Sequence, residues 1–133
     1  MSRENAPHHE PLPKNGRPGH IVAFKVDDIE GHVITSNYED GRLGQIFIYV
    51  AKQGSALRGI YEAWATAVSL GLQHGVPLES YVEKYVGQQF EPSGITNDEQ
   101  VRIVSSMADY VFRRLAIDYL DAATLDRLGI DPT

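Results

Sequence analysis

The sequence contains no cysteine. Without a thiol, the chain can form no disulfide, no cysteine-ligated zinc site and no thiolate nucleophile. Thiyl-radical chemistry is excluded for the same reason, because that radical resides on a cysteine sulfur. The five histidines include no H-E-x-x-H motif, and outside the N-terminal segment no two lie at helical spacing. We therefore expect no metal site, and no residue pattern requires a catalytic role.

Long hydrophobic runs and a surplus of positive charge are also missing. No window approaches the roughly 18 consecutive apolar residues that a membrane span requires. The first residues have no apolar core typical of a secretory signal, so we expect a cytoplasmic protein without a membrane partner. The formal net charge of −6 argues against general binding to DNA or RNA, which requires clustered Lys and Arg.

The length and composition fit one compact domain. The chain has 133 residues, of which 42% are hydrophobic and 23% charged. Residues 1–19 hold four of the seven prolines and few apolar side chains, which predicts a flexible tail. Residues 20–133 then form a single domain.

Three segments have the pattern of strands. Residues 21–26 and 32–37 alternate apolar and polar side chains, and Asp40-Gly41 marks a turn after them. Residues 45–51 are apolar at nearly every position, which predicts a central strand that is covered on both faces. We expect a small antiparallel sheet of about three strands.

Helices follow the strands. A long helix is expected from Ser55, its N-cap, to His74, and a short one begins at Pro77. Thr96 and Glu99 form a capping-box pattern before a second long helix over 97–119. Asp121 is expected to cap a final short helix that ends at Gly129. The fold class is therefore α+β, with two long and two short helices packed against the sheet.

The first long helix carries two side-chain patterns. One broad apolar stripe, expected to be its packing side, comprises Leu57, Ile60, Tyr61, Trp64, Val68 and Leu72. Small residues recur every four positions beside it, at Gly59, Ala63, Ala67 and Gly71. Each interior glycine costs about 0.8–1.0 kcal/mol of helix propensity, which close packing can offset. The partner is either the last long helix or the same helix of a second subunit, and the sequence alone does not decide which. The second case predicts a homo-oligomer.

A ligand site is the second use that these segments allow. The turn at Lys52, Gly54 and Ser55 places a helix N-terminus beside a lysine, which can hold an anion, although the G-x-x-x-x-G-K-[ST] frame is absent. Tyr61 and Trp64 could stack a base, and Arg113 with Arg114 is the densest basic spot on a helix. The structural alternative for each is simpler: a glycine turn, core aromatics and a solvated helix face.

The sequence also resembles a known family. The run SNYEDGRLGQIFIYVAKQGSALRGIYEAWATAVSLGLQHGVPLESYVEKYVGQQFEPSGITND, followed by DYVFRRLAIDYL, is similar to the C-terminal region of adenosylcobalamin-dependent (class II) ribonucleotide reductases, often called the TSCPD domain. The resemblance extends from about Leu12 to Leu120.

The resemblance implies a fold and an origin rather than a reaction. Family members are several times longer and carry their active-site cysteines, effector sites and cobalamin contacts elsewhere, and none of these residues maps onto this sequence. It therefore implies a non-catalytic module that uses no cofactor of its own and whose partner is a second copy or a reductase chain. The alternative is a protein that binds or sequesters a small nucleotide in a pocket between subunits.

Overall fold

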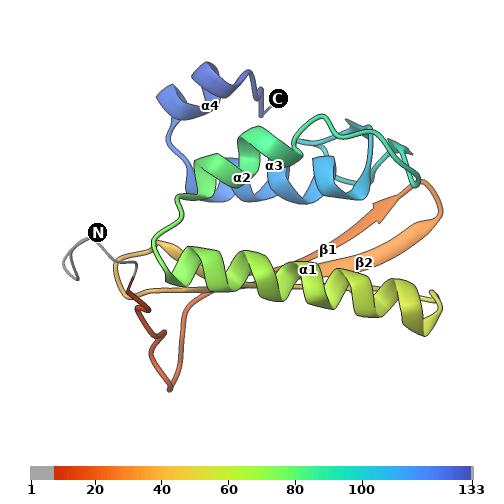
Figure 1. Ribbon diagram of the computed structural model, residues 1–133. Coiled ribbons are helices and arrows are strands. Elements are labelled where there is room, and N and C mark those ends of the chain that lie inside the picture. The colour runs from red at the N-terminus through yellow and green to blue at the C-terminus, as the bar shows by residue number, and fades with distance from the viewer. Residues whose placement is uncertain (1–7, 133) are drawn as a thin grey trace.

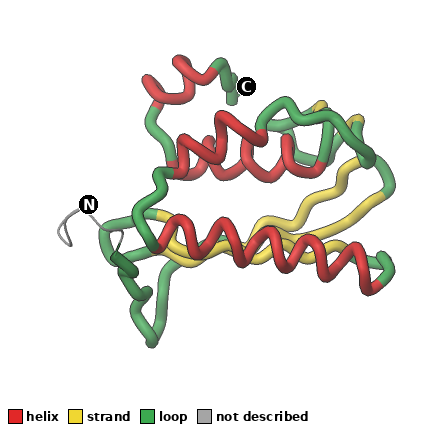
Figure 2. The backbone as a smooth tube through the Cα atoms, viewed as in Figure 1, coloured by secondary structure: helices red, strands yellow, loops and turns green. Residues whose placement is uncertain are grey.

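The structure is a computed structural model that describes residues 8–132. Within that range the elements follow the order β1 (Ile21–Val26), β2 (Ile29–Asn37), β3 (Leu43–Val50), α1 (Ser55–Gln73), α2 (Leu78–Tyr85), β4 (Gly94–Ile95), β5 (Ile103–Val104), α3 (Met107–Tyr119) and α4 (Ala122–Leu128). Figures 1 and 2 show α2 and α3 side by side on one side of the molecule and α1 on the other. The expected α+β class is confirmed.

The main sheet is antiparallel, with strands in the order β1-β2-β3. Val33 at its centre pairs with Val22 on one side and Ile48 on the other. The prediction that residues 45–51 form the central strand is wrong, because β2 occupies the middle and β3 the edge. The side chains of Phe47 and Tyr49 on β3 are 51% and 47% exposed. The strand is apolar on both sides although only one side is buried, and this misled the prediction.

Helix α1 covers the open edge of β3. The Ser69 hydroxyl accepts a hydrogen bond from the Ile46 N–H at 2.9 Å, and the Gln73 side chain donates one to the Gly44 carbonyl at 3.0 Å. These bonds satisfy backbone groups that an edge strand otherwise leaves free. The helix thereby seals the sheet on the side where another strand could add.

The packing side of α1 differs from the predicted stripe. Its buried residues are Tyr61, Ala65, Val68, Ser69 and Leu72. Leu57 and Ile60 instead face solvent, with Ile60 65% exposed, so their assignment to the buried stripe is wrong. The N-cap is Gly54 rather than Ser55, and no side chain caps this end.

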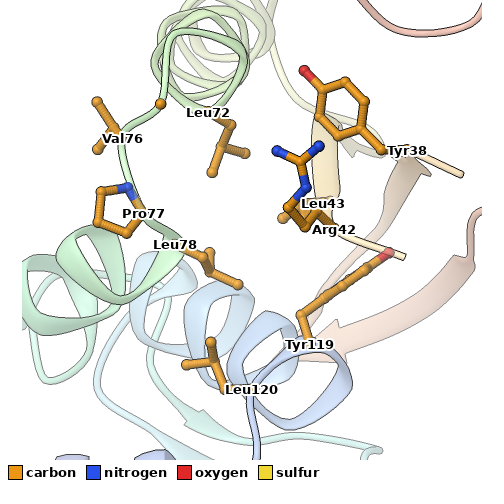
Figure 3. Close-up of a pocket in the computed structure, with 10 residues that line it drawn as sticks. Tyr38, Arg42, Leu43, Leu72, Val76, Pro77, Leu78, Tyr119 and Leu120 are labelled. Carbon is orange, nitrogen blue, oxygen red and sulfur yellow. The ribbon is translucent and has the colours of Figure 1, made fainter. Parts of the chain in front are cut away.

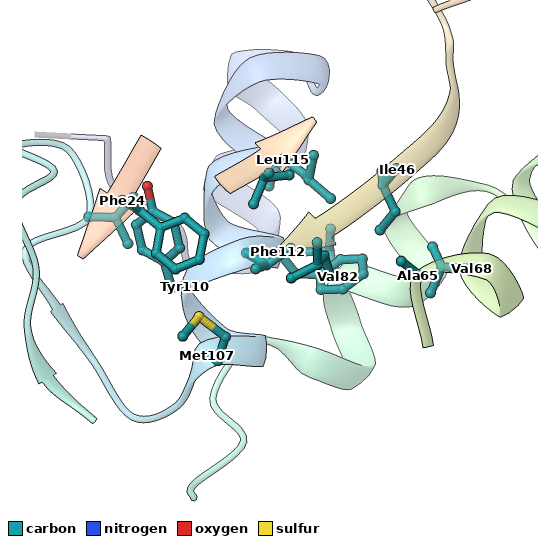
Figure 4. Close-up of a cluster of buried hydrophobic side chains, with 14 of the residues drawn as sticks. Phe24, Ile46, Ala65, Val68, Val82, Met107, Tyr110, Phe112 and Leu115 are labelled. Atoms are coloured by element: carbon teal, nitrogen blue, oxygen red, sulfur yellow. The ribbon is translucent and has the colours of Figure 1, made fainter. Parts of the chain in front are cut away.

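The core lies between the inner face of the sheet and the helices. Figure 4 shows Phe112 of α3 beside Val82 of α2, and Ile46 of the sheet near Val68 of α1. The rings of Phe24 and Tyr110 lie 4.9 Å apart, which joins β1 to α3. One continuous cluster thus holds the elements together.

The helix predicted over 97–119 is wrong over residues 97–106. Residues 94–95 and 103–104 form a two-stranded hairpin, and α3 begins only at Met107. The side chain of Ser106 caps it, accepting a hydrogen bond from the Asp109 N–H at 3.0 Å. The Thr96 hydroxyl instead accepts from the Asp98 N–H within the loop. Ser106 and Asp109 have the same spacing as Thr96 and Glu99, and the later pair is the real cap.

Two features at the ends of the chain complete the domain. Asp121 caps α4 by accepting from the Thr124 N–H at 2.8 Å, and α4 ends at Gly129, as predicted. Residues 8–19 contain no helix or strand, and hydrogen bonds join Glu10 to Gln73 and Tyr38. Flexibility of the tail stays a prediction, and residues 1–7 lie outside the described range.

Candidate functional site

The charged side chains of α3 serve the fold. The Arg114 residue is 8% exposed, and its guanidinium reaches Asp98 at 3.0 Å and Asp118 at 2.7 Å. The Tyr110 hydroxyl donates to Asp98 at 2.8 Å. Burial opposes ionisation of Asp98, but the hydrogen bonds from Arg114 and Tyr110 outweigh it, so its pKa is lowered. This cluster fastens the loop before β5 to α3.

A second cluster surrounds Asp109, whose side chain is fully buried. Its carboxylate accepts hydrogen bonds from the Gly87 N–H at 2.8 Å, the Ser105 N–H at 2.9 Å and the Arg113 Nε at 2.9 Å. A buried carboxylate requires such partners. Asp109 therefore ties the end of α2 and the hairpin to α3, and it fixes the Arg113 side chain.

The seven residues predicted to bind a ligand lie in three separate environments. Lys52, Gly54 and Ser55 form an exposed turn before α1, where Lys52 has a φ of 57°. Tyr61 is buried and Trp64 half-buried, with the Trp64 ring 5.5 Å from that of Phe112. The third environment comprises Arg113 and Arg114, bound to carboxylates on and beside α3. A ligand role for the set stays a prediction, and this geometry does not bring the set together.

A pocket of about 250 Å³ lies elsewhere, where the end of α1 approaches the start of α2 and the end of α3. Figure 3 shows its apolar wall of Leu72, Leu78 and Leu120, with Tyr119 and Arg42 across the opening. The Arg42 guanidinium is already paired with Glu10 at 2.8 Å and Asp40 at 2.7 Å. The pocket can receive an apolar group, but its cation is neutralised by the chain itself.

The small residues of α1 divide into two groups. Gly71 packs within the chain, because a Cβ there would collide with the Tyr81 hydroxyl. A Cβ at Gly59 meets no described atom within 4 Å, and Ala63 and Ala67 are exposed. The last three residues therefore line a helix side that contacts solvent.

Exposed apolar side chains gather on α1 and on the outer face of the sheet. Ile60 and Leu70 of α1 are 65% and 52% exposed, and Ile21 of β1 is 73% exposed. The register places Ile21, Ile34 and Phe47 in one row across the three strands. The sequence patterns predicted a partner only for the small residues of α1 and placed Leu57 and Ile60 on its packing side, so they missed this surface. The signal that could have revealed it is the near absence of charge from α1, which holds only Arg58 and Glu62.

Two kinds of site are absent from the part of the chain that the structure describes. No group of three or more His, Asp or Glu side chains in residues 8–132 could hold a metal ion. Over the same range, no helix is both long enough and apolar enough to span a bilayer.

Comparison with known proteins identifies the relatives of this chain. It is 48% identical over 127 residues to the vitamin B12-dependent ribonucleotide reductase of Streptantibioticus cattleyicolor, covering 96% of this chain and 21% of that protein. The corresponding reductases of Streptomyces coelicolor and Bradyrhizobium diazoefficiens are 48% and 44% identical, and the matched region covers 13% and 9% of their lengths. No solved structure matches.

The chain thus spans at most about a fifth of the length of these relatives. The family model for the TSCPD domain matches residues 15–119, which include β1 to β3 and α1 to α3. The chain belongs to the TSCPD domain family.

Proposed function

We propose that this chain is a non-catalytic interaction module of the B12-dependent ribonucleotide reductase family, acting through self-association or through binding to a reductase polypeptide. The observation that carries the proposal is the exposed apolar surface of α1 and β3, where Ile60, Leu70 and Phe47 are each more than half exposed. A hydrogen bond between Ile46 and Ser69 joins these two elements, and an exposed apolar surface on adjoining elements is typical of a protein-protein interaction site.

The chemistry of the side chains supports the same proposal. With no cysteine, the chain has no residue on which the reductase radical can form. The buried charged groups, Asp109 and Arg114, are bound to partners within the chain. Such groups stabilise a fold, and they have no free proton donor or acceptor directed toward a substrate.

We further propose that the chain does not hold adenosylcobalamin itself. The pocket beside Tyr119 measures about 250 Å³, whereas sites for drug-sized ligands span roughly 300–1,000 Å³, and a corrin is larger than such ligands. Among the described residues, no histidine lies in this pocket to coordinate a cobalt ion. The residues that line this pocket do not fit the cofactor, and we propose that a cobalamin would bind to a partner chain.

A nucleotide-binding role is the competing hypothesis. The same pocket favours it in one respect, because Tyr38, Tyr119 and Arg42 lie at its opening. An anionic ligand would have to displace Glu10 or Asp40 from Arg42, at a cost in charge pairing. The apolar surface requires no such displacement, and we therefore favour the interaction module.

Sedimentation velocity of the full chain, alone and with a purified B12-dependent reductase, tests the proposal. We expect either a concentration-dependent oligomer or co-sedimentation with the reductase. A chain that stays monomeric at high micromolar concentration and does not bind the reductase would contradict it.

A further inference from the structure

The solvent-facing side of α1 carries no charge. The two charged residues of this helix, Arg58 and Glu62, lie off the side that holds Ala56, Ile60, Ala63, Ala67, Leu70 and His74. The outward side of a surface helix normally carries charged and polar residues. Here, Ile60 and Leu70 are 65% and 52% exposed. This side of α1 therefore has the composition of an interface that another surface covers.

The spacing on this side is that of a helix-helix seam. The six residues from Ala56 to His74 follow one another in alternating steps of four and three, which is the spacing of a and d positions. Ala63 and Ala67 stand in the middle, where small side chains allow two helix axes to approach to about 8 Å. Ile60 and Leu70 flank them and can fill the space beyond.

Large and small residues on this side of α1 follow the same order in either direction along the helix. Ile60 and Leu70 each lie five residues from Ala65, and Ala63 and Ala67 each lie two residues from it. On an antiparallel copy of the same helix, Ile60 would meet Leu70 and Ala63 would meet Ala67. A twofold interface requires this relation, in which residue i contacts j and j contacts i.

We infer that α1 pairs with α1 of a second copy of this chain, antiparallel, about a twofold axis at the level of Ala65. The inference rests on the proposed function and gives its self-association a geometry. An antiparallel pair also sets each helix N-terminus beside the other's C-terminus, which favours association.

The available area supports a second copy as the occupant, while net charge does not. Two copies that each carry a net charge of −6 repel one another, but this side of α1 brings no carboxylates against each other. A helix of 19 residues is about 28 Å long and about 10 Å wide, so α1 alone provides less than the roughly 800 Å² that an interface of standard size takes from each partner. Phe47 and Tyr49 extend the area, because β3 adjoins α1 through the bond between Ile46 and Ser69.

Single cysteine variants test the register, because the natural chain contains no thiol. In the antiparallel pair, a copy with Ala63→Cys faces a copy with Ala67→Cys. Two Ala63→Cys copies are instead offset by four residues, about 6 Å along the axis, which together with the interhelical distance exceeds the ~7 Å Cα separation that a disulfide spans. Mild oxidation of an equal mixture should give at least fivefold more disulfide dimer than either variant alone.

A charge placed on the seam tests the same pairing without a cross-link. Ala67→Glu should weaken dimerisation at least tenfold, measured by sedimentation equilibrium. Ala123→Glu is the matched control, since it is also an exposed helical alanine but lies on α4, and it should leave the dimer unchanged. At a concentration where both proteins are monomeric, circular dichroism of Ala67→Glu should show the wild-type melting curve, because residue 67 is exposed in a single copy.

The outcomes separate this inference from the proposed function. A dimer that forms no mixed disulfide, or that Ala67→Glu does not weaken, overturns the α1 pairing while self-association itself stands. Equal cross-linking of each variant alone indicates parallel helices and also overturns it. A chain that is monomeric at every concentration overturns the pairing, and the proposed function then depends on the reductase titration.

Discussion

The hydroxyl of Ser69 lies on the backbone of Ile46, accepting from its N–H at 2.9 Å and lying 3.1 Å from its carbonyl oxygen. A helix side chain thus takes the place of a neighbouring strand at this point of β3. The residue is buried, so water cannot replace the hydroxyl. This contact fixes α1 along the sheet edge and thereby directs its uncharged side outward.

The first prediction concerns that contact. Ser69→Ala should lower the free energy of unfolding by about 1–3 kcal/mol, because it leaves buried backbone groups without a partner. The measurement is urea denaturation followed by circular dichroism. Thr66→Ala is the control, since the Thr66 hydroxyl donates only to the Glu62 carbonyl on an exposed helix side and should cost less. Equal losses in the two variants would contradict the role of Ser69.

The second prediction concerns Asp109. Asp109→Ala should cost about 3–5 kcal/mol, because it removes a buried carboxylate with its ion pair to Arg113 and leaves the Gly87 and Ser105 N–H groups without their acceptor. Arg113→Ala should cost clearly less, since the Arg113 side chain is 37% exposed and the backbone donors to Asp109 remain. Denaturation of both variants checks the order. If Arg113→Ala proves the more damaging change, the carboxylate is not the organising group.

The third prediction concerns pH. Because the pKa of Asp98 is lower in the folded chain than in the unfolded one, its stabilisation is present above the unfolded value of about 4 and is lost as pH falls through the folded value. The unfolding free energy should therefore fall between pH 5 and pH 3. Exposed carboxylates contribute to the same trend, so Asp98→Asn is the necessary comparison and should show a shallower decline. Parallel curves for the two proteins would remove Asp98 from the account.

The fourth prediction compares two glycines of one helix. Both Gly59→Ala and Gly71→Ala gain about 0.8–1.0 kcal/mol of helix propensity. At Gly59 the added methyl group meets no described atom, so the monomer should become more stable. At Gly71 it collides with Tyr81, whose ring is stacked on Tyr85, and the variant should be less stable. Thermal melting at low protein concentration checks the signs, and equal shifts would contradict the packing of Gly71.

Sequence patterns located the sheet and most helices. Local signals were sufficient for α4, because Asp121 and Gly129 mark its two ends. They failed where two local signals competed. Thr96 with Glu99 and Ser106 with Asp109 have the same spacing, so spacing alone does not show which pair begins a helix. The contacts of Asp98 with Tyr110 and Arg114 hold the first segment as a loop against α3. The strand order was missed because side-chain patterns do not reveal which neighbour a strand takes.

The candidate site was less predictable than the fold. Arg113 and Arg114 have the pattern of a free basic patch, yet each pairs with a carboxylate four residues away on α3, Asp109 or Asp118. Helical spacing could have assigned these two pairs, whereas the contact of Arg114 with Asp98 required the fold. The small residues of α1 are visible in the sequence, and their role in oligomer packing stays a prediction. Their division into Gly71, which packs against Tyr81, and Ala63 with Ala67, which face solvent, required the fold.

Native mass spectrometry of the full chain, alone and with added ribo- and deoxyribonucleotides, tests the central claim most directly. The account predicts a homo-oligomer that carries no stoichiometric nucleotide, consistent with an uncharged α1 side that binds a second copy. A monomer loaded with one nucleotide per chain would contradict it, and the pocket beside Tyr119 would then be the first place to look for the ligand.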